Sequence, residues 1–127
     1  MKLFLAVFVG GGLGSLLRYV LQLAWSGRAG EWAFPWSTFG INVLGSFCIG
    51  LFGVLASRLC LPDEARLFLV TGLCGGFTTF STFSNEGLAL LRQGLYGSFL
   101  AYAVGSLVLG LAAAFAGCWA GGFVHGR

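Results

Sequence analysis

The chain has 127 residues, of which 57% are hydrophobic and only 9% charged, and its formal net charge is +3. A typical soluble domain carries about 25% charged residues, and a chain of this length has too small an interior to hide so much apolar surface from water. Composition therefore predicts an integral membrane protein, and the absence of a basic stripe excludes a nucleic-acid-binding protein.

Four apolar segments are each long enough to cross a bilayer, which takes about 20 residues. They cover residues 3–25, 38–57, 66–91 and 96–123. We therefore expect residues 1–127 to form one all-α membrane domain with four transmembrane helices.

The breaks between these segments carry helix-ending signals. Pro62 before two acidic residues is typical of a helix start, and 92–94 (RQG) is a short stop. Trp25, Trp32 and Trp36 surround the first break, as they would in an interfacial aromatic belt.

Lysine and arginine are spread almost evenly over the two membrane sides. The side of the termini carries Lys2, Arg58, Arg66 and Arg127, and the opposite side carries Arg28 and Arg92, with Arg18 inside the first span. Orientation follows this asymmetry, so a weak bias specifies orientation weakly. Two arrangements stay open: cytoplasmic termini in every copy, or insertion in both orientations. Dual insertion would let two copies pair antiparallel and supply the inverted repeat of many transporters.

The third span contains an unusual run, 75–84 (GGFTTFSTFS). Gly, Ser, Thr and Phe are weaker helix formers than Ala or Leu, and irregular backbone at membrane depth occurs only where protein or water surrounds it. We therefore predict that this helix is broken mid-membrane, with Gly75 and Thr78 at the break. Carbonyl groups that lose their helical hydrogen bonds at the break need other partners, and a cation such as Na⁺ could be such a partner.

Phe80 and Phe83 share a helix face at spacing i, i+3, with Thr79 and Thr82 paired beside them and Ser84 one turn after Phe80. Lipid or core packing would explain two phenylalanines. An ion path would explain them too, because a ring edge carries positive potential and hydroxyls donate hydrogen bonds in place of water.

Other polar residues fall at helical spacing within the spans. Asn42 and Ser46 are i, i+4 in the second span, as are Tyr102 and Ser106 in the fourth. They act either as hydrogen-bonding contacts between helices or as the lining of an ion path.

Arg18 and Glu86 are ionisable residues at or near membrane depth, where such residues usually have a function. Arg18 either lines an anion vestibule or reaches the headgroups, and Glu86 either lines a vestibule or meets the water interface. No intramembrane His or Lys stands near a Ser, so hydrolytic catalysis lacks a base and we expect no enzyme.

Three ordered motifs together resemble the Fluc (CrcB) fluoride channels of microbes: 10–19 (GGGLGSLLRY), 37–46 (STFGINVLGS) and 72–84 (GLCGGFTTFSTFS). The resemblance covers the whole chain, and the third motif is the most specific. Phe77 departs from it, at a position where an aliphatic residue is more usual.

The resemblance implies an antiparallel, dual-topology homodimer in the bacterial inner membrane, with two fluoride pores and a central structural Na⁺. The Na⁺ would be held by the backbone carbonyls of Gly75 and Thr78. The positions that match the family's pore are Phe80, Phe83, Asn42, Ser106, Tyr102, Thr79, Thr82 and Ser84, and those that match its vestibule are Arg18 and Glu86. The implied activity is passive export of cytoplasmic fluoride. A small dual-topology multidrug exporter, or a membrane subunit without transport activity, is the alternative; an acidic residue in the first span would favour the exporter, and none is present.

Overall fold

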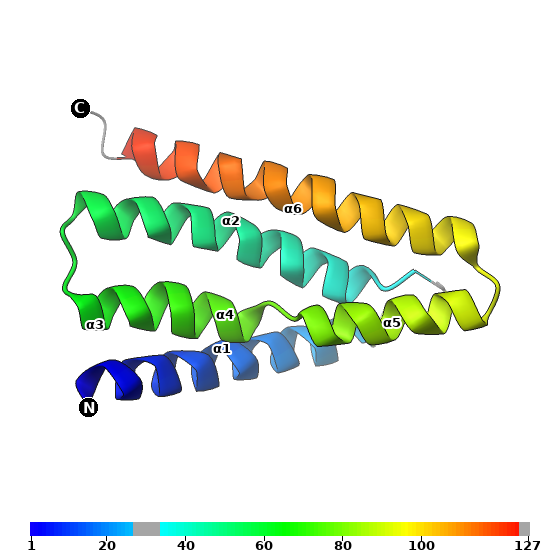
Figure 1. Cartoon of the computed structure of the whole chain (residues 1–127), viewed down its shortest axis with the longest axis horizontal. Coiled ribbons are helices and arrows are strands. Elements are labelled where there is room, and N and C mark those ends of the chain that lie inside the picture. Colours follow the sequence, from blue (N-terminus) through cyan, green and yellow to red (C-terminus); the bar gives the residue numbers. More distant parts are fainter. Residues whose placement is uncertain (27–33, 125–127) are drawn as a thin grey trace.

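The computed structural model describes residues 1–26 and 34–124, and these are helical apart from short connections (Figure 1). Four helices are long and apolar enough to cross a membrane: Lys2–Ser26, Trp36–Arg58, Asp63–Arg92 and Tyr96–Gly122. This confirms the all-helical chain with four apolar spans. The predictions for Arg28, Trp32 and Arg127 lie outside the described residues.

The first, second and fourth spans are continuous helices, and the third is composite. The continuous helices are α1 (Lys2–Ser26), α2 (Trp36–Arg58) and α6 (Tyr96–Val124). The third span runs through α3 (Asp63–Arg66), the π-helix η1 (Leu67–Cys74), α4 (Gly75–Phe77) and α5 (Phe80–Arg92).

The four spans lie as a row of packed neighbours (Figure 1). Helix α6 packs mainly on α2, and α1 packs mainly on η1 and α4, whereas α1 and α6 do not touch within the described part of the chain. Large apolar side chains consequently face outward, among them Phe8, Phe115 and Trp119 at 78%, 75% and 71% exposure. Such wide apolar faces need lipid or another protein chain to cover them.

Glycines allow the backbones of α1 and the third span to approach closely. A Cβ atom built on Gly14 would lie 2.8 Å from the backbone nitrogen of Phe77, and one built on Gly72 would lie 3.0 Å from Gly10 Cα. Small residues at membrane helix interfaces permit this approach. The third span is therefore fixed against α1 along much of its first half.

Two predicted helix boundaries are confirmed. Helix α3 starts directly after Pro62. At the end of α5, Gly94 adopts a left-handed φ of +73°, and the Leu95 N–H donates to the Leu90 carbonyl at 2.9 Å, which is a glycine-terminated helix end. Helices α1 and α3 start, and α6 ends, at the same end of the bundle (Figure 1).

The third span is interrupted at one of the two predicted residues. Gly75 is helical, with φ −63° and ψ −38°, whereas Thr78 and Thr79 are extended, with ψ of 155° and 110°. The interruption predicted at Thr78 is confirmed, and Gly75 lies in the last short helical segment before it. The neighbouring Gly76 allows close packing on α1, because a Cβ there would collide with the backbone of Gly11.

Candidate functional site

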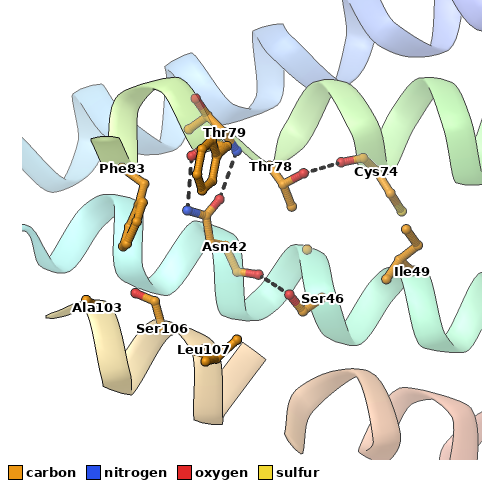
Figure 2. Close-up of a pocket in the computed structure, with 12 residues that line it drawn as sticks. Asn42, Ser46, Ile49, Cys74, Thr78, Thr79, Phe83, Ala103, Ser106 and Leu107 are labelled. Carbon is orange, nitrogen blue, oxygen red and sulfur yellow. Dashed lines mark hydrogen bonds between the residues drawn. The ribbon is translucent and has the colours of Figure 1, made fainter. Parts of the chain in front are cut away.

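A cavity of about 450 Å³ lies beside the interruption of the third span (Figure 2). Its walls come from α2, the end of η1, the break with the start of α5, and α6. The lining residues are Asn42, Gly45, Ser46, Ile49, Cys74, Thr78, Thr79, Phe80, Phe83, Ala103, Ser106 and Leu107. The sequence-predicted residues in this lining are Asn42, Thr78, Thr79, Phe80, Phe83 and Ser106; those outside it are Gly75, Thr82, Ser84, Tyr102, Arg18 and Glu86.

The side-chain amide of Asn42 holds the break in place. The Thr79 N–H donates to Asn42 Oδ1 at 2.9 Å, and Asn42 Nδ2 donates to the Thr79 carbonyl at 3.2 Å (Figure 2). One side chain thus satisfies both backbone polar groups of a residue that has left the helix, which matters because unpaired backbone groups are costly away from water. Asn42 is in turn joined to its neighbour one turn on, since Ser46 Oγ donates to the Asn42 carbonyl at 2.7 Å.

The break separates the carbonyls of residues 75–78 from their usual helical donors, and Gly75 and Thr78 are the two that were predicted as cation ligands. In an unbroken α-helix the N–H groups of Thr79 and Thr82 would donate to the carbonyls of Gly75 and Thr78. Here Thr79 N–H donates to Asn42, and Thr82 N–H donates to the Thr79 hydroxyl, which caps α5 at 3.2 Å. The carbonyls of Gly75 and Thr78 are therefore open to another partner.

The adjoining carbonyls behave differently. Gly76 O accepts from Ser15 Oγ at 3.4 Å and from Arg18 Nε at 3.3 Å. Cys74 O accepts from both the backbone nitrogen and the hydroxyl of Thr78, each at 3.1 Å. Arg18 is thus directed to the α1 side of the break, away from the cavity lining.

Three aromatic rings form a continuous stack beside the cavity. The ring centroids of Phe80 and Phe83 are 5.7 Å apart with an interplanar angle of 29°, and those of Phe83 and Tyr102 are 4.8 Å apart at 33°. Tyr102 is fully buried, at 0% exposure, whereas Phe80 is 79% exposed. The shared face predicted for the two phenylalanines is confirmed, and the buried ring of Tyr102 packs against the ring of Phe83.

Glu86 is held between α2 and α6. Its Oε1 accepts from Thr38 Oγ1 at 2.8 Å and its Oε2 accepts from the Tyr102 hydroxyl at 2.9 Å. Both carboxylate oxygens are thereby hydrogen-bonded, as a half-buried carboxylate in an apolar setting requires. Sequence reasoning missed Thr38, which is only 1% exposed; its position one turn before Asn42 on the same helix face was the available signal.

The hydroxyl groups of the other predicted site residues differ in whether they form hydrogen bonds. Thr79 Oγ1 donates to Thr82 Oγ1 at 2.9 Å, so Thr82 supports the cap of α5, and Ser84 is exposed. Ser106 Oγ is buried at the cavity wall and has no hydrogen-bond partner among the described residues. A buried unpaired hydroxyl calls for an explanation, and an occupant of the cavity that accepts a hydrogen bond supplies one.

The cavity suits a small anion that is neutralised by donors and ring edges rather than by a full charge. Asn42, Thr79 and Ser106 bring polar groups to its walls, and Phe80 and Phe83 bring aromatic rings. Within the described residues, no cluster of His, Cys, Asp or Glu could hold a metal ion; the open backbone carbonyls beside the cavity are the oxygen ligands that this region offers a hard cation.

Comparison with known proteins places this chain in a defined group. The sequence model of the family described as CrcB-like protein, Camphor Resistance (CrcB), matches residues 5–118. A protein of Phocaeicola vulgatus named "Fluoride-specific ion channel FluC" is 53% identical over 119 residues, covering 94% of this chain and 98% of that relative. A protein of Thermus thermophilus with the same name is 53% identical over 126 residues, covering 99% of this chain and 100% of the relative. A third, from Leptospira interrogans, is 44% identical over 119 residues, covering 93% of each chain.

Proposed function

This chain belongs to the CrcB-like family, and we propose that it is a fluoride-selective channel through which cytoplasmic fluoride leaves the cell passively. The observation that carries the proposal is the cavity at the break of the third span, where an unpartnered Ser106 hydroxyl and the ring of Phe83 line the same space. The named relatives are ion channels, so the chain is a multi-pass membrane protein that conducts an ion, and it is not an enzyme.

Polar groups and ring edges in the cavity wall can take the place of the water molecules that hydrate fluoride. Fluoride is small and strongly hydrated, so it enters an apolar site only where hydrogen-bond donors stand in for water. Ser106 Oγ supplies a hydroxyl donor, and Asn42 Nδ2 keeps one of its two hydrogens, because only one bond from it, to Thr79, is formed among the described residues. The rings of Phe80 and Phe83 add positive edges without a full charge that would trap the ion.

Passive export needs no energy-coupling domain. Hydrogen fluoride crosses membranes as a neutral acid, ionises inside and becomes trapped as the anion. An inside-negative potential then drives the anion outward with about 2.3 kcal/mol per 100 mV. A selective pore in the cytoplasmic membrane of a bacterium is therefore sufficient.

The proposal extends to an antiparallel homodimer with two pores. Three residues at the cavity are largely uncovered in the single chain: Phe80, Leu107 and Ile49 at 79%, 65% and 43% exposure. A second copy would close this side, and dual insertion agrees with the nearly even lysine and arginine distribution. Labelling of a Lys2→Cys variant from only one side of sealed vesicles would contradict the antiparallel arrangement.

The break also provides ligands for a structural Na⁺. The carbonyls of Gly75 and Thr78 have lost their helical donors, and no side chain of the described residues donates to either oxygen. Gly75 is exposed, and a Cβ added there would meet nothing within 4 Å, so another backbone can approach it. Two such pairs of carbonyl oxygens, one from each copy, would hold a hard cation and bind the two broken helices together.

We expect the dimer to weaken when Na⁺ is replaced by a large organic cation, and the variant Thr78→Ala to keep this dependence. Thr78 would bind the cation through its backbone carbonyl, while its hydroxyl already donates to Cys74 O at 3.1 Å. The monomer–dimer equilibrium in detergent, measured with and without Na⁺, tests both points. A wild-type equilibrium that ignores Na⁺ would contradict the site, and a Thr78→Ala dimer that has lost its Na⁺ dependence would assign the ligand to the hydroxyl instead.

In cells, the channel should lower fluoride in the cytoplasm. Bacteria without their own fluoride export, grown in fluoride at acid pH, should accumulate less fluoride when they express this chain. Equal accumulation with and without a correctly inserted chain would refute the proposal. Resistance to cationic drugs without any change in fluoride would instead favour the exporter, although no acidic residue lies within α1.

A further inference from the structure

Helices α1 and α3 both begin at one end of the bundle (Figure 1). A second hollow is lined by residues from these two helix starts and from η1. Its volume is about 390 Å³, and its walls are formed by Leu3, Asp63, Arg66, Leu67, Val70 and Thr71. Asp63 is the first residue of the third span, so it lies at the membrane–water interface. Val70 follows seven residues later, roughly 10 Å deeper at the rise of an α-helix. The hollow thus runs from charged groups at the interface to an apolar wall at the depth of the acyl chains.

The polar groups in this hollow are unused. Asp63 and Arg66 have opposite charges and lie one turn apart on the same span, but neither side chain forms a hydrogen bond or ion pair with any residue that the structure describes. The same is true of the hydroxyl of Thr71, which is an exposed residue. The Asp63 carboxylate, the Arg66 guanidinium and the Thr71 hydroxyl are therefore available to a ligand, in this order from the start of the third span.

We propose that this hollow binds a zwitterionic phospholipid whose headgroup carries a primary amine, such as phosphatidylethanolamine. The Arg66 guanidinium receives the phosphate, a match that guanidinium geometry favours. The Asp63 carboxylate receives the ammonium, and the first methylene groups of an acyl chain lie on Leu67 and Val70. The proposal concerns lipid alone and holds whichever ion the channel conducts.

Charge complementarity selects this headgroup over the other common ones. Phosphatidylglycerol offers the same phosphate to Arg66, but its uncharged glycerol brings no positive charge to Asp63. Phosphatidylcholine carries a quaternary ammonium, which has no N–H to donate to the carboxylate. Of the three headgroups, only the primary ammonium brings Asp63 both an opposite charge and N–H donors.

Native mass spectrometry of the full-length protein, titrated with the three lipids on identical acyl chains, tests the proposal. We expect phosphatidylethanolamine to bind about tenfold more tightly than phosphatidylcholine or phosphatidylglycerol, which is the discrimination of one hydrogen bond to a charged group. Asp63→Asn should remove this preference, and Arg66→Gln should weaken all three lipids. Arg92→Gln, at the far end of the same span, is the matched control and should change nothing.

Equal binding of the three lipids by the wild-type chain would overturn the proposal. So would an unchanged preference in Asp63→Asn. Soluble phosphoethanolamine should compete poorly, because it lacks the acyl chain; competition as strong as that of the whole lipid would show a site for a soluble ligand instead. Both mutated side chains lie at the rim of the hollow and outside the buried core, so the variants should fold, which an unchanged unfolding midpoint would verify.

Discussion

Replacing Phe83 by Ile, or Phe80 by Ile, should abolish fluoride conduction while leaving the fold intact. Isoleucine keeps the apolar volume but removes the ring, and with it the positive edge that faces an anion. Phe83 stands between Phe80 and Tyr102 in the stack, with centroid distances of 5.7 and 4.8 Å. If the ring contributes about 3 kcal/mol to lowering the barrier, flux falls by about 100-fold.

The matched control for this change is Phe8→Ile. Phe8 is 78% exposed and lies on α1, outside the cavity. Fluoride efflux from liposomes, normalised to the amount of folded protein, measures all three variants. Full flux in both Phe80→Ile and Phe83→Ile would remove the ring edges from the mechanism, and a loss in Phe8→Ile would indicate a nonspecific effect of the substitution.

A single methyl group added at Gly14 should prevent correct packing of the first span. A Cβ there would collide with Leu73 O and come within 2.8 Å of Phe77 N, and both are backbone atoms that cannot rotate away. Overpacking of this kind costs about 1–3 kcal/mol or more, which exceeds the gain of about 1 kcal/mol that Ala brings to a helix interior. We therefore expect Gly14→Ala to lower the unfolding midpoint and to reduce the yield of folded protein.

Gly12→Ala provides the comparison within the same helix. Apart from its own helix backbone, no atom of the described residues lies within 4 Å of a Cβ at Gly12, so the same change in helix propensity occurs without a collision. This variant should be as stable as the wild type or slightly more so. If the unfolding midpoints of the two variants shift equally, the close approach of α1 to the third span would not be a determinant of stability.

The sequence was sufficient to predict the four apolar spans and half of the cavity lining. Long apolar segments can only be helices in a bilayer, and Phe80 and Phe83 had to share a face because of their spacing. Asn42, Thr79 and Ser106, which the sequence also singled out, line the same cavity. These residues could be found because they stand out in the sequence, as polar or aromatic residues within apolar helices.

Other features depend on contacts between spans and could not be read from one segment. Asn42, on another helix, bonds to both backbone groups of the extended Thr79. Gly76, from the glycine pair that signalled a break, packs against Gly11. The π-helix at Leu67–Cys74 has no sequence signature of its own. From the sequence Glu86 was expected at a vestibule or at the water interface, but not to accept hydrogen bonds from Thr38 and Tyr102 of two other spans.

The most direct test of the fluoride channel is efflux from liposomes that contain only the purified chain. Fluoride is followed with an ion-selective electrode, valinomycin carries potassium to balance the charge, and chloride is followed in a parallel preparation. We predict fast release of fluoride while chloride is retained. Retention of fluoride by the well-folded, membrane-inserted protein, or equal release of chloride, would contradict the assignment of the cavity as a fluoride-selective pore.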